Sequence, residues 1–339
     1  MSIGKKQRVA ASTRLPPEVL LDILSDATTR TLRSAALVHP TWKGPSQYLL
    51  HQEVSLPSRK IAKSFLQVQG RTQYSKKLSL PISLDIDDSC EILESTKGLQ
   101  DLVLVSTEGA TGKSKFEVEL LEASSLAGLR SLQLTAPFSE PIDRCIHPSA
   151  SFTFPFRLKA LSFKGTYDSY PSALLHGLAD SSSTSITSLD LDVYGSQASA
   201  TRFFDGLLAL APHLEHVEIH GSDRSSPALL IFLTACTSLK SFTCWMANPE
   251  LLSALPHSVE TLQICKTYVF HTDLAYDSLL SRSDILSHIR LIRWSGISEA
   301  SLKAQRGGCE LLADLAEMGI ETQFGAVSQG HWYGLGLRY

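Results

Sequence analysis

A short apolar pattern that recurs along the chain constrains the fold more than any other feature. The pattern is apolar-x-x-apolar-x-apolar, and its clear copies are "LQDLVL" (99–104), "LRSLQL" (129–134), "LKALSF" (158–163), "ITSLDL" (186–191), "LEHVEI" (214–219), "LKSFTC" (239–244), "VETLQI" (259–264) and "IRLIRW" (289–294). Hydrophobic residues make up 43% of the chain, so eight copies at similar spacing are not expected by chance. Weaker copies centre on Val54 and Leu78, and a further weak copy lies near Thr322.

The spacing of these copies predicts repeating strand–helix units. The middle apolar residues lie at positions 54, 78, 102, 132, 161, 189, 217, 242, 262 and 292, which gives units of 20 to 30 residues. The stretches between them carry apolar residues at three- and four-residue steps, as helices do. Pro171, Pro227 and Pro249 suit first helical turns, and Asn248 suits a helix cap. Units of this length stack into a curved α/β solenoid with a parallel sheet on its concave side.

The segment 15–55 has a different character, because it predicts three short helices. "LPPEVLLDIL" (15–24) begins with prolines that fit a first helical turn, "TLRSAALVHPTW" (31–42) ends its helix before Pro40, and "GPSQYLLHQEV" (44–54) starts a helix at Pro45. Three such helices cannot enclose a core of their own. Their apolar surface must therefore be covered by the rest of the chain or by a partner protein.

The ordered set "LPPEVLLDIL", "LRSAALVHPTW" and "HQEVSL" resembles the F-box, whose pattern is Leu-Pro-x-Glu, an apolar helix, a Leu-Val pair and a nearby Trp. The resemblance implies that these side chains bind a Skp-family adaptor: Leu15, Pro16, Glu18, Leu20, Ile23 and Leu24. It also implies that Leu37, Val38 and Trp42 mostly support the fold. The period of the remaining chain matches the leucine-rich repeat, so residues 15–325 resemble an F-box protein with leucine-rich repeats. One departure is that Asn248 is the only asparagine, so the asparagine ladder common in these repeats is absent.

The resemblance implies a domain order and a role. We expect a disordered tail (1–14), an F-box (15–55), a leucine-rich-repeat-like domain (56–325) and a C-terminal tail or cap (326–339). The implied role is a non-catalytic substrate-recognition subunit of an SCF-type cullin–RING E3 ubiquitin ligase in the cytoplasm or nucleus. The adaptor would link it to the cullin and RING subunits, and the repeats would bind a protein target. The alternative is a leucine-rich-repeat scaffold whose N-terminal helices only cap the solenoid.

The outward positions of the predicted strands are where a target would bind. They are Gln133, Lys164, Asp190, Asp192, His216, Glu218, Thr243, Trp245, Gln263 and Arg293. Solenoid concave faces are extended binding surfaces, and exposed Trp and Arg side chains often anchor interfaces. The predicted target-binding residues are therefore Asp190, Asp192, His216, Glu218, Trp245 and Arg293. Trp245 could instead be tucked against a neighbouring loop, and the sequence leaves both open.

The stretch "LVLVSTEGATGKS" (102–114) resembles a phosphate-binding loop. A Walker A motif needs a glycine five residues before Gly112, and that position is Thr107. The preceding strand also belongs to the repeat. We therefore expect no nucleotide or other cofactor here. An NTPase is a third hypothesis, which binding of labelled ATP or GTP that depends on Lys113 would support.

No other chemistry is predicted. On one strand, His216 and His220 would lie about 13 Å apart, too far to share a metal ion, so we expect a solvated row and no metal site. No nucleophile motif suggests catalysis, and the six cysteines form no C-x-x-C pair, which fits reduced thiols. The net charge of −3 and the absence of an 18-residue apolar run predict neither nucleic-acid nor membrane partners.

Overall fold

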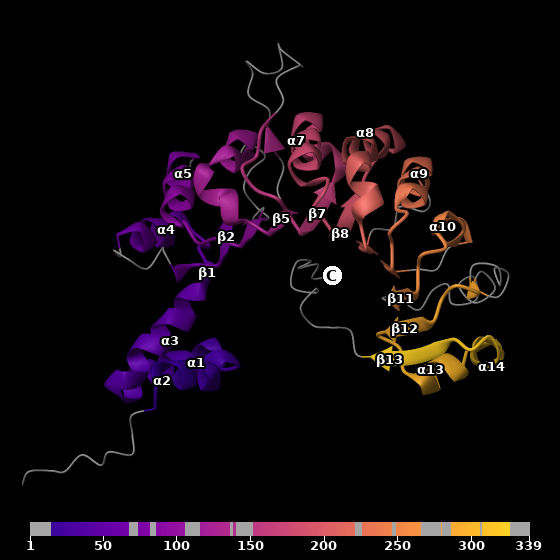
Figure 1. The fold of residues 1–339 in the computed structure, drawn as a ribbon, viewed down its shortest axis with the longest axis horizontal. Helices are drawn as coiled ribbons and strands as arrows, with labels where there is room; N and C mark the ends of the chain where they lie inside the picture. The colour runs from indigo at the N-terminus through magenta and orange to yellow at the C-terminus, as the bar shows by residue number, and fades with distance from the viewer. Residues whose placement is uncertain are drawn as a thin grey trace, which may run out of the picture.

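One curved, parallel β-sheet forms the body of the protein, and helices line its outer side (Figure 1). The computed structural model describes residues 15–67, 74–81, 86–105, 116–135, 138–139, 152–220, 226–245, 249–265, 279, 286–305 and 307–325. Within these residues the sheet has eleven strands, and its strand order follows the chain order. Three helices precede the sheet and lie at one end of the curve (Figure 1).

The strands lie where the apolar pattern predicts them. They are β1 (Glu53–Ser55), β2 (Lys77–Pro81), β3 (Asp101–Val105), β5 (Ser131–Thr135), β7 (Ala160–Thr166), β8 (Ser188–Tyr194), β9 (His216–Ile219), β10 (Ser241–Cys244), β11 (Thr261–Cys265), β12 (Leu291–Ser295) and β13 (Glu321–Gly325). Every neighbouring pair is parallel, and the middle apolar residue of each copy faces that of the next, from Val54 opposite Leu78 to Ile292 opposite Thr322. The weak copy near Thr322 is thus the last strand.

Helices connect most of these strands. They are α4 (Arg59–Leu66), α5 (Ile86–Ser95), α7 (Ser172–Ser182), α8 (Gln197–Leu207), α9 (Pro227–Ala235), α10 (Pro249–Ala254), α13 (Glu299–Lys303) and α14 (Gly308–Glu317). Pro227 and Pro249 begin their helices as predicted, whereas Pro171 precedes α7 as its N-cap residue. Asn248 lies outside the described residues.

Two connections depart from the predicted strand–helix unit. Between β3 and β5 the described residues form the short strand β4 (Phe116–Glu117) and the 3₁₀ helices η3 (Val118–Glu122) and η4 (Ser124–Gly128) instead of an α-helix. Before β7 an extended segment buries Phe152, Phe154 and Phe156, whose rings stack with centroids 6.0 and 5.3 Å apart. Alternate residues of an extended chain point the same way, so three large rings fill the layer that a helix fills in other units.

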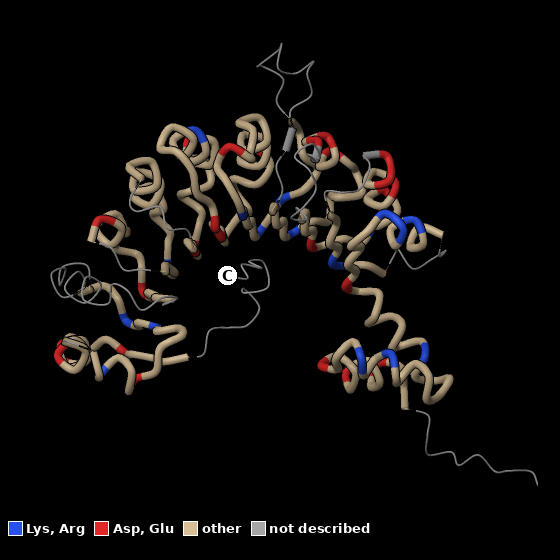
Figure 2. Tube along the Cα trace, turned by 180° about the vertical axis from the view of Figure 1, so that it is seen from behind, with Lys and Arg blue, Asp and Glu red and all other residues tan. Residues whose placement is uncertain are grey.

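The main core lies between the sheet and its outer helices. Strand burial alternates, as in β3 and β5, where every second side chain is buried. The buried side chains pack with those of the helices in one continuous cluster that extends from Leu56 to Ile320. The other strand side chains therefore face the inner side of the curve (Figures 1 and 2).

The N-terminal helices are α1 (Pro17–Ser25), α2 (Thr29–Val38) and α3 (Pro40–Gln52). The first two begin and end close to the predicted positions. The third was predicted to start at Pro45 but starts five residues earlier, because Pro40 occupies its first turn and the His39 side chain accepts a hydrogen bond from the Thr41 N–H. α3 ends at Gln52, so the last three residues of the predicted segment 15–55 form the strand β1. No helix among the described residues is long and apolar enough to cross a membrane.

Candidate functional sites

The first candidate site is the apolar surface of helices α1 and α2. The expectation that the three N-terminal helices cannot enclose a core of their own is wrong, because Leu24, Leu32 and Ala35 form a small core with partly buried neighbours that include Trp42. This core leaves large apolar side chains exposed: Leu15 (44%), Val19 (40%), Ile23 (55%), Leu37 (88%) and Val38 (76%). We call these five side chains the N-terminal apolar patch.

The structure divides the predicted adaptor-binding residues into two groups. Leu15, Pro16, Glu18 and Ile23 are exposed, whereas Leu20 and Leu24 are only 2% and 3% exposed. Leu24 belongs to the core of the three helices and Leu20 is buried as well, so of the six predicted residues only the four exposed side chains are available to a partner. The expectation that Leu37 and Val38 support the fold is wrong, because both lie on the surface at the C-terminal end of α2. Helical periodicity did not reveal this, since it places apolar residues on a face without saying what covers that face.

The second candidate site is the inner face of the sheet. The strand register places one side chain from each unit in a row, which includes Gln133, Ser162, Asp190, Glu218, Thr243, Gln263, Arg293 and Gln323. Arg293 is exposed, and its Nε donates a hydrogen bond to Oε1 of Gln323 over 3.3 Å. Thr243 does not present an open surface as predicted, because it is only 8% exposed. Lys164 and Asp192 face each other in a parallel row nearby.

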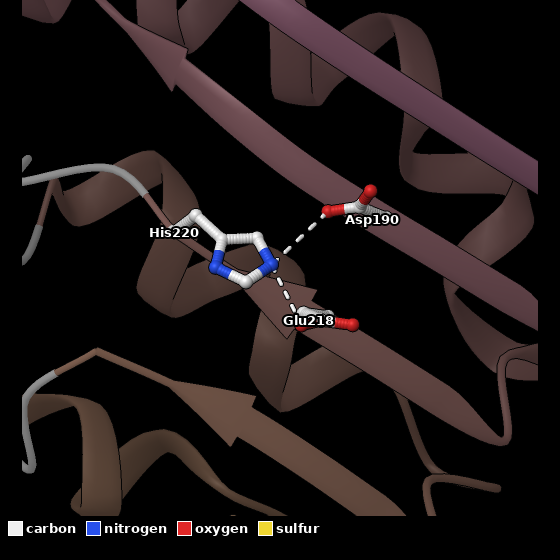
Figure 3. Close-up of side chains that lie close together, drawn as sticks. All are labelled: Asp190, Glu218 and His220. Atoms are coloured by element: carbon white, nitrogen blue, oxygen red, sulfur yellow. Dashed lines mark ion pairs between the residues drawn. The ribbon is translucent and has the colours of Figure 1, made fainter. Parts of the chain in front are cut away.

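Three side chains from two neighbouring strands converge at the middle of this face (Figure 3). Asp190 on β8 lies directly opposite Glu218 on β9, and His220 follows at the end of β9. The Nε2 atom of His220 lies 2.6 Å from Oε1 of Glu218 and 3.6 Å from Oδ1 of Asp190. Asp190 is held from its other oxygen, since Oδ2 accepts a hydrogen bond of 2.8 Å from the Ser162 hydroxyl. We call Asp190, Glu218 and His220 the inner-face cluster.

Burial and mutual charge perturb the cluster. Burial raises the pKa of Asp190, and the charge of Glu218 adds to the rise, although the Ser162 hydrogen bond and the charges of His220 and Lys164 oppose it. For His220, burial alone lowers the pKa. The hydrogen bond and charge of Glu218, with the charges of Asp190 and Asp192, together outweigh burial, so the pKa of His220 is raised. The site thus concentrates negative charge in partly buried surroundings.

Trp245 packs beside this cluster rather than standing free on the inner face. Its indole Nε1 contacts Nδ1 of His220, and the two rings meet edge to face with centroids 5.7 Å apart. The side chain is half-buried. Trp245 therefore packs against the cluster, and its partner His220 is the first residue after β9, which agrees with the alternative that Trp245 is tucked against a neighbouring connection.

The predicted row of solvated histidines is only half right. His216 is exposed as expected, but the His220 side chain is only 11% exposed. Considering one strand at a time gave no reason to expect a His216–His220 metal pair, but it missed the carboxylate on the next strand. The signal was present, because Asp190 and Glu218 each follow the middle apolar residue of their copy and so share a position in the repeat.

Among the residues that the structure describes, the remaining sequence motifs contribute no further site. The Walker-like residues Thr107, Gly112 and Lys113 lie outside the described residues. Cys236 and Cys244 are buried, and burial raises the pKa of each thiol to about 12, so both pack as small apolar side chains. No protein-family model and no curated protein matches this chain.

Proposed function

We propose that this protein is a substrate-recognition subunit of an SCF-type cullin–RING ubiquitin ligase. In this proposal α1–α3 act as an F-box that binds a Skp-family adaptor. Residues 56–325 act as a leucine-rich-repeat-like solenoid that holds a protein target on its inner face. The observation that carries the proposal is the N-terminal apolar patch, in which Leu37 and Val38 are 88% and 76% exposed.

The position of this patch favours a protein partner. Several large apolar side chains exposed together on one small helical unit mark a candidate interaction site. The helices stand at one end of the sheet, where the body of the chain leaves α1 and α2 uncovered (Figure 1). Covering Leu37 or Val38 in a complex would contribute about 1.5–3 kcal/mol per side chain. The Leu-Pro turn at Leu15 and Pro16, which carries the resemblance to the F-box, lies in the same unit.

The curved sheet supports the second half of the proposal. Concave faces of repeat proteins bind extended partners, and the inner face offers polar and charged side chains from nearly every strand, among them Asp192, Glu218 and Arg293. Because α3 runs into β1 without intervening residues, a bound target would keep a nearly fixed position relative to the adaptor. The chain itself would catalyse nothing. It would raise the effective concentration of the target at the ligase.

The alternative role, a repeat scaffold capped by its N-terminal helices, has less support. A cap would cover the open edge of β1 with apolar side chains. In Figure 1 α3 alone leads to β1, and α1 and α2 lie farther from the sheet. Leu37 and Val38 would also be expected to pack on the sheet edge in a cap, and they are exposed instead.

Binding to a purified Skp-family adaptor, measured by isothermal titration calorimetry, tests the proposal. Replacing both Leu37 and Val38 by Ser is expected to weaken binding at least about tenfold, because two apolar anchors are lost. Leu15→Ala with Pro16→Ala is expected to abolish capture while the sheet stays folded. Ile231→Ser is the matched control, since Ile231 on α9 is 64% exposed but lies far from the patch in sequence and in the fold (Figure 1). A folded chain that forms no complex with the adaptor would refute the proposal.

A further inference from the structure

The inner-face cluster has the composition and geometry of a metal-binding site. Its three possible ligand atoms, one each from Asp190, Glu218 and His220, all lie within 4.8 Å of one another. Figure 3 shows both carboxylates turned toward the same imidazole nitrogen. The side chains are 21%, 31% and 11% exposed respectively, so they are partly withdrawn from water. This inference goes beyond the proposed ligase role and does not depend on it.

The charge balance of the site favours a cation. The parallel register forces two carboxylates against each other, and Asp192 adds a third negative charge nearby. Lys164 is a nearby positive charge that acts on Asp190. Bringing like charges together in partly buried surroundings costs free energy unless a cation compensates for them. A divalent ion supplies that charge at one point, between the oxygens and the imidazole.

We propose that Asp190, Glu218 and His220 bind a divalent transition-metal ion of the zinc class. Two carboxylate oxygens and one imidazole nitrogen suit Zn²⁺ and related ions, whereas Mg²⁺ and Ca²⁺ prefer all-oxygen sites. Three protein ligands leave a coordination position for water or for a side chain of a bound partner. The Ser162 hydroxyl donates a hydrogen bond to the Asp190 carboxylate and would hold it in place for the ion without binding the ion itself.

The contact with Trp245 supplies an optical signal for this binding. An indole N–H can only donate, so Nδ1 of His220 accepts from Trp245 and the proton lies on Nε2, facing Glu218. A neutral imidazole that binds a metal ion through Nε2 carries its single proton on Nδ1, so binding would move the proton from Nε2 to Nδ1. Two N–H groups then face each other, and the indole has to move. Metal binding is therefore expected to change the fluorescence of Trp245.

The test titrates the purified, chelator-treated full chain with Zn²⁺ by calorimetry and with Co²⁺ by visible absorption. We expect one equivalent to bind, with Co²⁺ bands that lack the charge-transfer absorption of thiolate ligands. His220→Gln and Glu218→Gln are expected to weaken binding at least about tenfold, and Ser162→Ala about tenfold. His216→Gln and Glu215→Gln are matched controls, because both lie in or beside the same strand but outside the cluster.

The outcomes separate a metal site from an ion pair. Binding that is lost in the cluster variants and kept in the controls supports the proposal. Trp245→Phe is expected to bind the ion without the fluorescence change. Absence of stoichiometric binding by the folded chain would overturn the proposal and leave an ion-paired histidine. Binding that persists in the two cluster variants, or that carries thiolate absorption, would also overturn it, because the ion would then lie on other histidines or on cysteines.

Discussion

Replacing Gly206 by Ala tests how closely neighbouring units are packed. Gly206 lies in α8, beside α7 of the preceding unit. A Cβ atom added there would lie 2.7 Å from Cβ of Leu175 and 3.2 Å from its Cδ1, well short of the 3.4–4 Å of ordinary contact. The Leu175 Cβ is fixed to the backbone, so no side-chain rotation relieves the contact. The two helices have to move apart.

The expected magnitude follows from two opposing terms. Overpacking of a dense core costs about 1–3 kcal/mol, whereas alanine in place of glycine in a helix gains up to about 1 kcal/mol. The net effect is a loss of about 0–3 kcal/mol. Gly44 in α3 is the matched control, because a Cβ added there meets nothing within 4 Å. Gly44→Ala is therefore expected to gain at most about 1 kcal/mol, because Pro45 crowds a Cβ on the residue before it and offsets part of the gain.

Hydrogen exchange measured by mass spectrometry suits this comparison, since it reports opening of each helix separately. Peptides from α7 and α8 should exchange faster in Gly206→Ala, and peptides from α3 should exchange more slowly in Gly44→Ala. If Gly206→Ala slows exchange in α7 and α8 as much as Gly44→Ala does in α3, the close approach of these helices is not a constraint, and the packing argument fails.

Two further predictions concern buried polar groups. The Tyr170 hydroxyl lies 2.6 Å from the carbonyl oxygen of Lys164 and accepts a hydrogen bond from the Lys164 backbone N–H over 3.0 Å. Tyr170→Phe is expected to lower the free energy of unfolding, measured with urea, by about 1–3 kcal/mol. Tyr194→Phe, at an exposed position, is expected to change it little. Because burial raises the pKa of Cys236 from 9.0 to about 12, the unfolded thiol ionises first, and stability is expected to fall above pH 9 by about 1.4 kcal/mol per pH unit. In Cys236→Ala, stability should fall less steeply with pH. A thiol reagent should label the exposed Cys309 but not Cys236 in the native chain, and equal labelling of the two would contradict the burial of Cys236.

Much of the sheet could be predicted because the repeated pattern gives both the spacing of the strands along the chain and the side of the sheet that is apolar. Ten middle apolar residues and the weak copy near Thr322 predicted the strands of the large sheet, and in the structure these residues pair with one another from Val54 to Thr322. The connections were less predictable, because a helix and a row of phenylalanines both bury apolar surface in the same layer. The start of α3 was missed for a similar reason, since Pro40 can end one helix and begin the next.

For the candidate sites too, the sequence predicted the helices and strands but not how they pack. Apolar residues in "LRSAALV" indicated a helix, but the exposure of Leu37 and Val38 depends on where α2 packs relative to α1 and α3. The conjunction of Asp190 with Glu218 and His220 depends on two units lying side by side. A comparison of equivalent positions in successive repeats would have indicated that Asp190 and Glu218 are neighbours. It would not have indicated that the His220 ring points toward them.

The sequence by itself determined the strands, their parallel order and the side chains that face inward, because alternation along a strand assigns every residue to one of two faces. Only the tertiary structure decided which polar side chains meet. Asp190 and Glu218 are far apart along the chain, yet adjacent strands lie only about 4.8 Å apart. Curvature and side-chain rotamers then placed His220 and Trp245 against them, and these depend on packing between units that no single repeat encodes.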